Sequence, residues 1–244
     1  MTGVRAGFGR ASRQPLVAGV AAALAVLTLV AAGLLWLMTD RSEGSTGTGT
    51  PSDTSAEAGF ARDMAVHHQQ AVEMSFIVRD RTDDEEVRRL AYDIINTQAN
   101  QRGMMLGWLD LWGLDVTSDD PPMTWLERGS KDHGSMDHEG MEGMGDGSRY
   151  TPHDGSLMPG MATNAELDKL RSAKGKKAEV LYLQLMTAHH KGGVMMARGA
   201  VKLADDPTVT RLARTMVQGQ QSEIALMADL LKARGARAPS GSGT

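Results

Sequence analysis

The sequence of 244 residues contains no cysteine. Disulfide bonds and thiolate metal sites are therefore excluded, and a soft metal could be bound only through methionine sulfur and histidine nitrogen. Aromatic residues are also scarce, at 4% of the chain, whereas methionine is abundant at 17 residues. Methionine is a flexible and polarizable core residue. Its use in place of aromatic core residues is the first unusual feature of the chain.

Motifs of enzymes and of nucleic-acid-binding proteins are missing as well. The net charge of −4 provides no basic surface for nucleic acid. Without a cysteine nucleophile or a Gly-x-Ser-x-Gly elbow, nothing supports nucleophilic hydrolysis. The chain also lacks the Glu-x-x-His motif that di-iron four-helix bundles carry on two helices. We therefore expect a protein that is not an enzyme, with a metal-dependent oxidase as a remote alternative.

Only one long hydrophobic run is present, from Leu16 to Met38. It is long enough to cross a bilayer as a helix. The arginines of segment 1–15 predict that this short N-terminus lies in the cytoplasm and that the rest of the chain lies outside it. We therefore expect a single-pass membrane anchor at 16–38. The alternative is a cleaved signal segment, because small residues at 31–33 offer a cleavage site, and the protein would then be secreted.

Three segments are predicted to be connections or tails by their composition. Residues 39–55 are rich in Ser, Thr and Gly, as in a flexible tether. Residues 117–162 lack apolar periodicity and are rich in Asp, Gly, His and Met, and residues 235–244 are predicted to be a disordered tail. What remains is enough for one modest domain over 56–234.

The predicted domain contains one sequence unit twice, with residue n of the first copy matching residue n+122 of the second. A repeat at a fixed offset is typical of a duplicated structural unit. The identical pairs include Met64/Met186, His67/His189, His68/His190, Val72/Val194, Met74/Met196, Asp83/Asp205, Val87/Val209, Arg89/Arg211, Leu90/Leu212, Ala91/Ala213, Gln98/Gln220, Met105/Met227 and Leu109/Leu231.

Each copy predicts two helices, since no segment shows sustained strand alternation and apolar residues recur at helical spacing. Capping pairs and glycines indicate where helices begin and end. They are Thr54 with Glu57, Thr82 with Glu85, Thr163 with Glu166, Asp206 with Pro207, and Gly113, Gly175 and Gly235. We therefore predict an all-α fold in which two helical hairpins, 56–116 and 163–234, pack as a four-helix bundle.

What both copies retain, beyond core apolar residues, is a set of histidines and methionines at helical spacing. Thioether and imidazole ligands favour copper among the soft and borderline metals. Asp63, four residues before His67, could accept a hydrogen bond from a ring N–H of that histidine without binding the metal itself. The candidate ligands are Met64, His67, His68, Met74, Met186, His189, His190 and Met196.

A structural interpretation of the same residues competes with the metal site. A methionine stripe at helical spacing is usually core, and a histidine on an apolar face is often a hydrogen-bonded structural residue. Adjacent histidines differ by about 100° around a helix, so one of each pair could face solvent. The duplication favours the metal site. A buried imidazole carries a desolvation cost unless it is paired, and both copies nevertheless retain the two histidines.

The central segment 117–162 is a second candidate region, because Met and His gather there without helical or strand periodicity. We interpret it as a flexible copper collector of lower affinity, with linker drift as the alternative. The candidate ligands are His133, Met136, His138, Met141, Met144 and His153, and Met158 and Met161 follow them.

These motifs, together with Met158-Pro159-Gly160-Met161 and Glu223-Ile224, resemble the bacterial DUF305 family over residues 56–234. The resemblance implies a ferritin-like four-helix fold, an exported or membrane-tethered location and, for some members, copper binding. One departure is Gln101-Arg102, which stands where the second copy has Glu223-Ile224.

The sequence thus predicts a membrane-tethered extracytoplasmic metal-binding protein, with copper as the expected ion, that acts as a buffer, scavenger or chaperone. Its partners would be the metal ion and, through 16–38, the membrane. The alternative is a metal-free helical interaction module that binds another envelope protein or a second copy of itself, since exposed methionine also supports adaptable contacts.

Overall fold

The computed structural model describes residues 49–132 and 150–239, and this part of the chain is helical without strands. The predicted all-α class is thereby confirmed. The described residues contain four long helices and two short ones: α2 (Ala56–Arg79), α3 (Glu85–Leu111), α4 (Thr124–Asp132), α5 (Asn164–Ser172), α6 (Lys176–Leu203) and α7 (Pro207–Ala233).

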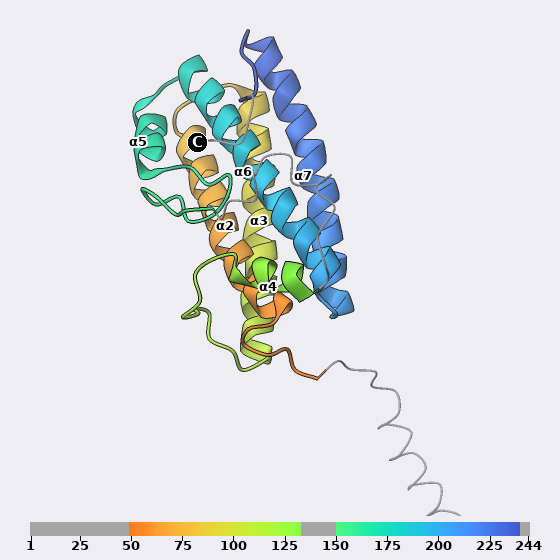
Figure 1. The fold of residues 1–244 in the computed structure, drawn as a ribbon. Coiled ribbons are helices and arrows are strands. Elements are labelled where there is room, and N and C mark those ends of the chain that lie inside the picture. Colours follow the sequence, from red (N-terminus) through yellow and green to blue (C-terminus); the bar gives the residue numbers. More distant parts are fainter. Residues whose placement is uncertain (1–48, 133–149, 240–244) are drawn as a thin grey trace, which may run out of the picture. The chain divides into compact units, whose positions relative to one another are not determined.

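The four long helices form two antiparallel hairpins, α2 with α3 and α6 with α7 (Figure 1). The hairpins meet mainly along α2 and α6, so these two helices form the centre of the domain. The short helices α4 and α5 pack against α2 and α6 (Figure 1). Residues on the facing sides of α2 and α6 are therefore buried.

Several predicted helix ends are confirmed by their capping geometry. Thr163 and Glu166 form a reciprocal capping box at the start of α5. Asp206 caps α7 with Pro207 in its first turn. Gly175 separates α5 from α6, and Gly113 follows the end of α3 with a positive φ of 67°.

Two predicted caps were wrong by one or two residues. Ser55, and not Thr54, is the N-cap of α2 and accepts a hydrogen bond from the Ala58 amide. Asp84 caps α3, because its carboxylate accepts from the Val87 amide. The Thr82 hydroxyl instead donates to Glu179 of the other hairpin and accepts from the Asp84 amide.

Helix α4 was not predicted, because its region was expected to lack regular structure. It is held by burial of Trp125 and Leu126, which are only 5% and 6% exposed. Gly59 of α2 and Gly199 of α6 provide the room, since a Cβ at either position would overlap these two side chains. Apolar periodicity does not reveal a helix of nine residues in which only two side chains are buried against the bundle.

The core consists of two apolar clusters, one toward each end of the domain. The first surrounds Phe60 and Trp125, and the second surrounds Tyr182 and Leu170. Met158 belongs to the first cluster at 1% exposure, so the expectation that core packing does not explain the methionines of 117–162 was wrong for this residue. Met161 packs against the same cluster.

A pair of glutamates ties the two hairpins together in a reciprocal way. Glu57 at the start of α2 accepts hydrogen bonds from the amides of Asp205 and Asp206, in the turn between α6 and α7. Glu179 at the start of α6 accepts from Thr82, in the turn between α2 and α3. Because Glu57 and Glu179 are equivalent in the repeat, the contact is duplicated with the fold.

None of the helices in residues 49–132 and 150–239 is long and apolar enough to cross a membrane. The predicted anchor at 16–38, segment 1–15 and most of the tether 39–55 lie outside the described residues.

Candidate metal centre

The four repeated histidines lie together where α2 and α6 face each other. We call His67, His68, His189 and His190 the His layer, and each of their side chains is at most 1% exposed. The rings of His67 and His189 overlap, with centroids 3.7 Å apart and planes inclined by 31°. The alternative that one histidine of each pair faces solvent was therefore wrong.

Two glycines of α6 that follow the histidine pair allow close approach of neighbouring groups. A Cβ at Gly192 would overlap the carbonyl oxygen of Pro159, and a Cβ at Gly193 would overlap the side chain of Gln220. Gln70 of α2 fixes the same segment by exchanging two hydrogen bonds with the backbone of Ala162, of 2.9 and 2.7 Å. The Met-Pro-Gly-Met segment is thus pressed onto α6 beside the His layer.

Each imidazole uses its Nε2 atom for a hydrogen bond to an oxygen. His67 bonds to the Pro159 carbonyl at 3.3 Å, and His189 bonds to the His67 carbonyl at 3.0 Å. A carbonyl can only accept, so Nε2 carries the proton in both rings. His68 bonds to the side-chain oxygen of Gln101 at 2.8 Å, and His190 bonds to a carboxylate oxygen of Glu223 at 2.6 Å.

The other ring nitrogen, Nδ1, is buried without a hydrogen-bond partner in all four histidines, as far as the described part of the chain extends. A buried polar atom that is left unsatisfied costs about 1–3 kcal/mol. Four such atoms in one layer are therefore expensive for a residue type that a duplicated core could have replaced by leucine. In neutral imidazole with its proton on Nε2, Nδ1 is the nitrogen that can bind a metal.

Burial keeps the rings neutral. Desolvation, aided by nearby His68, lowers the pKa of His67 to about 3. Desolvation also lowers the pKa of His68 to about 4, against the opposing hydrogen bond to Gln101. For His189, burial and the neighbouring His67 hold the pKa well below its usual range. At neutral pH these three rings therefore offer lone pairs on Nδ1 and no positive charge.

Residues of α3 and α7 complete the layer, and sequence reasoning did not assign them this role. Gln101 and Glu223 are equivalent in the repeat and each holds the second histidine of its own hairpin. The buried amides of Gln98 and Gln220 lie one turn earlier on the same helices, at 2% and 5% exposure. The identity of Gln98 and Gln220 in the repeat was visible in the sequence. A repeated position alone, however, does not show which side chains a glutamine contacts.

The candidate methionines flank the His layer within the apolar clusters. Met64 and Met196 belong to the cluster around Phe60, and Met74 and Met186 belong to the cluster around Tyr182. All four are 0% exposed. The histidines therefore lie between methionines of the two clusters along both α2 and α6.

Nitrogen and oxygen donors alone do not make a closed site in the part of the chain that the structure describes. No group of three or more His, Asp or Glu side chains there is arranged to hold a metal ion. The side chains that remain as possible donors are the single imidazoles of the layer and the buried methionines of the two apolar clusters, and soft ions prefer this type of donor.

The candidates of the central segment are mostly outside the described residues, namely His133, Met136, His138, Met141 and Met144. His153 is described and lies apart from the His layer. It is exposed, pairs with Ser156 through the backbone, and bonds through Nδ1 to the Thr151 carbonyl.

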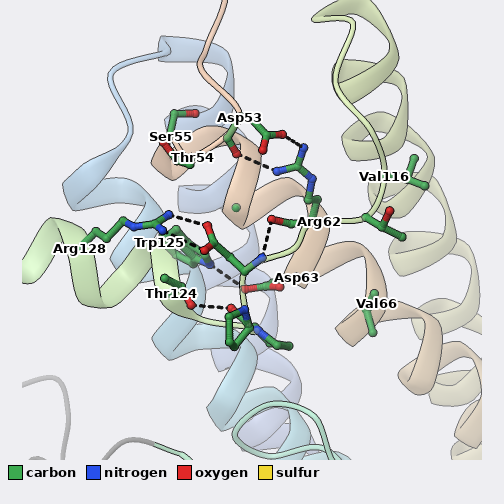
Figure 2. A pocket seen from close by; sticks show the side chains of 16 residues that line it. Asp53, Thr54, Ser55, Arg62, Asp63, Val66, Val116, Thr124, Trp125 and Arg128 are labelled. Atoms are coloured by element: carbon green, nitrogen blue, oxygen red, sulfur yellow. Dashed lines mark hydrogen bonds and ion pairs between the residues drawn. The ribbon is translucent and has the colours of Figure 1, made fainter.

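The predicted role of Asp63 beside His67 was wrong. Its carboxylate accepts a hydrogen bond from the Trp125 indole at 2.9 Å (Figure 2). It also accepts one from the Met123 amide at 2.7 Å, and so it holds α4 onto α2. Burial raises its pKa to about 6. Asp63 points away from the histidines because the face of α2 on which it lies packs against the segment leading into α4.

A surface pocket of about 210 Å³ lies at this end of α2 and shares no residue with the His layer (Figure 2). Its cationic groups are already paired. Arg62 is bonded to Asp53 and to the Asp115 carbonyl, and Arg128 forms a two-bonded pair with Asp120.

Fold and site together define a class of protein, an all-helical domain with duplicated hairpins and a buried layer of imidazoles. The chain belongs to the family described as "Domain of unknown function (DUF305)", whose profile matches residues 57–231. A DUF305 protein from Streptomyces coelicolor, described as a secreted protein, is 58% identical over 78% of this chain and 99% of its own, with a TM-score of 0.64.

More distant structures share the fold. A DUF305 fragment from Deinococcus radiodurans is 30% identical over 73% of this chain and 96% of its own, with a TM-score of 0.54. CopM in a silver-bound form is 18% identical over 73% of this chain and 96% of its own, with a TM-score of 0.50. A comparison with curated proteins gives no match.

Proposed function

We propose that this protein is an extracytoplasmic binding protein for a soft metal ion, copper first of all, which the His layer and its flanking methionines hold. The observation that carries the proposal is the set of four buried Nδ1 atoms that find no partner among residues 49–132 and 150–239. Soft ions that accept these lone pairs would satisfy atoms that the fold otherwise leaves at a cost of about 1–3 kcal/mol each.

The chemistry of the donors favours a soft ion. Met64, Met74, Met186 and Met196 supply thioethers from both sides of the layer, and thioether with imidazole selects Cu(I). Zinc prefers a closed tetrahedral set of nitrogen, sulfur or oxygen ligands. When bound, the ion would supply positive charge at Nδ1, while the protein's part is to orient each ring through its Nε2 hydrogen bond.

Location and role complete the proposal. The predicted anchor at 16–38 would tether the domain outside the cytoplasm, and the S. coelicolor relative described as secreted supports the same side of the membrane. A site in which a metal satisfies buried atoms suits a buffer, scavenger or chaperone. The central Met/His segment would collect ions at lower affinity before they reach the bundle.

Metal addition to the purified full-length chain tests the proposal. A ligand that binds only the folded state stabilises it, by about 2.7 kcal/mol at a free concentration one hundred times its Kd. We expect Ag(I), used as a probe for Cu(I), to raise the melting temperature clearly and Zn(II) to raise it less. An unchanged melting temperature with both ions would favour the metal-free interaction module.

Variants of the four histidines locate the ion. Glutamine places an amide near the position of Nε2 and keeps a donor there, but it lacks the Nδ1 lone pair. The chain with all four histidines of the layer changed to glutamine should lose the shift in melting temperature. The matched control is His153→Gln, which removes one exposed imidazole. Equal metal stoichiometry in both variants, with circular dichroism showing folded protein, would remove the bundle site.

A further inference from the structure

The two halves of the His layer have the same geometry but different chemistry behind the second histidine. In the first hairpin, the Nε2 of His68 meets a neutral amide oxygen of Gln101 at 2.8 Å. In the second hairpin, the Nε2 of His190 meets a carboxylate oxygen of Glu223 at 2.6 Å. Gln101 and Glu223 occupy equivalent positions of the repeat, so the difference is one of charge rather than of position.

The next residue of the repeat enhances the difference. Arg102 follows Gln101, and its Nε atom is buried without a hydrogen-bond partner in the described residues. The equivalent residue of the second hairpin is the apolar Ile224, which packs against the Tyr182 cluster. The residue after the repeated position thus carries a guanidinium in the first hairpin and a hydrocarbon side chain in the second.

We infer that Glu223 makes the His189–His190 half the tighter and first-filled half of the layer, and that the His67–His68 half is the weaker. This inference rests on the proposed function and concerns soft monovalent ions of the Cu(I) and Ag(I) class. Glu223 is a positioning residue, because it acts through the His190 ring and does not reach the ion itself.

The physical reason is compensation of charge in a buried place. A cation that enters a layer of neutral rings must leave water, and a buried charge is tolerated only when it is paired. A carboxylate that accepts the Nε2 proton of a ligating histidine fixes the tautomer and makes the other nitrogen a better donor to metal. An amide oxygen also fixes the tautomer, but it contributes no negative charge. Gln101 therefore orients the His68 ring without making its Nδ1 a better donor.

The overlapped rings of His67 and His189 separate the two halves. One ring from each hairpin lies at this contact, with centroids 3.7 Å apart and planes inclined by 31°, and the second histidine of each hairpin has an oxygen partner from that same hairpin. Each hairpin therefore presents its own histidine pair, and the two pairs are able to differ in affinity.

Exchange of the two residues tests the inference. The probe is Ag(I), titrated into the full-length chain in competition with a chelator of known affinity, which gives a dissociation constant for each binding step. Loss of a partner of this kind typically weakens metal binding 10–100-fold. We expect Glu223→Gln to weaken the tightest step by such a factor, and Gln101→Glu to tighten the weaker one.

The double variant Gln101→Glu/Glu223→Gln keeps the net charge and should restore two separated steps. In that variant, the imidazole nitrogen signals of His67 and His68 should shift first with Ag(I), whereas those of His189 and His190 shift first in the unchanged chain. A purely structural role of Glu223 would not reverse this order.

Asp229→Asn is the matched control, since it removes one exposed carboxylate from the same helix α7. If Glu223→Gln leaves the tightest step within threefold of the Asp229→Asn value, the inference is wrong even though the chain binds silver. If silver binding persists unchanged when all four histidines of the layer are glutamine, the proposed function itself is wrong.

Discussion

The Nδ1 atoms of the His layer are the residue-scale feature that distinguishes this domain from a simple helical bundle. Each ring is held through Nε2 by a hydrogen bond, and its Nδ1 has no partner within the part of the chain that the structure describes. Fixing one nitrogen and freeing the other is the arrangement by which proteins prepare histidine for metal. The cost of the free atom must be carried by the rest of the fold.

The same burial makes the stability of the metal-free protein depend on pH. In the unfolded chain His67, His68 and His189 take up protons near pH 6.5, whereas in the folded protein their pKa values are lowered, to about 3 for His67 and about 4 for His68. Between these values the unfolded state binds more protons, so stability is complete above pH 6.5 and falls as the pH decreases.

We therefore expect the free energy of unfolding, measured by urea denaturation with a chelator present, to fall by about 2–3 kcal/mol between pH 6 and pH 5. Each fully shifted group contributes about 1.4 kcal/mol per pH unit. Asp63 opposes the three histidines, because its pKa of about 6 lies above the ordinary 3.8 and the folded state keeps its proton longer. A flat or rising profile would contradict the buried neutral rings.

Asp63→Asn provides the control for that measurement. The amide oxygen still accepts from Met123 and Trp125, but the opposing titration is gone. The loss of stability between pH 6 and pH 5 should therefore be steeper in this variant than in the unchanged chain.

At the scale of elements, the segment between the hairpins decides whether the His layer closes. Pro159 provides the carbonyl that holds His67, and the segment reaches α6 only because Gly192 has no side chain. Helix α6 therefore has a glycine where helix propensity would favour alanine, and tertiary packing is the reason.

We expect Gly192→Ala to destabilise the protein by about 1–3 kcal/mol, the usual cost of an overpacked core, despite the better helix propensity of alanine. Gly219→Ala is the matched control in α7, where nothing lies within 4 Å of the added Cβ. That change should stabilise the protein by about 1 kcal/mol. The free energy of unfolding of both variants is measured by urea denaturation. Equal changes in the two variants would mean that the segment containing Pro159 does not pack closely against α6.

At the scale of the whole molecule, duplication explains how two short hairpins form one domain. The equivalent glutamates Glu57 and Glu179 each hold the turn of the other hairpin. At the Glu179 end, the buried Arg234 adds a second tie, because its guanidinium contacts both Glu179 and Asp84. The hairpins are therefore joined at their ends as well as along α2 and α6.

Removal of this tie should loosen the docking of the hairpins. We expect Arg234→Ala to cost about 3–5 kcal/mol, because it leaves Glu179 buried and without its charged partner. Arg128→Ala removes an exposed pair with Asp120 instead and should leave the melting temperature unchanged. Calorimetry that gives similar melting temperatures for the two variants would show that the Arg234 cluster does not join the hairpins.

The fold was largely predictable from sequence because its signals are local or repeated. Helical spacing, capping residues such as Asp206 and the n+122 register require no knowledge of distant contacts. Helix α4 was missed because Trp125 and Leu126 have meaning only against α2 and α6. Asp63 was assigned to the wrong partner because helical spacing gives the face of a residue, but not the element that covers that face.

The sequence by itself determined the helical class, the duplication and the identity of the paired histidines, since each follows from periodicity along one chain. Only the tertiary structure decided that all four rings are buried together, that Nδ1 is the open nitrogen, and that a carboxylate supports one half while an amide supports the other. These properties depend on which side chains from α2, α3, α6 and α7 meet across the bundle. The packing of separate helices sets them, and no local pattern encodes it.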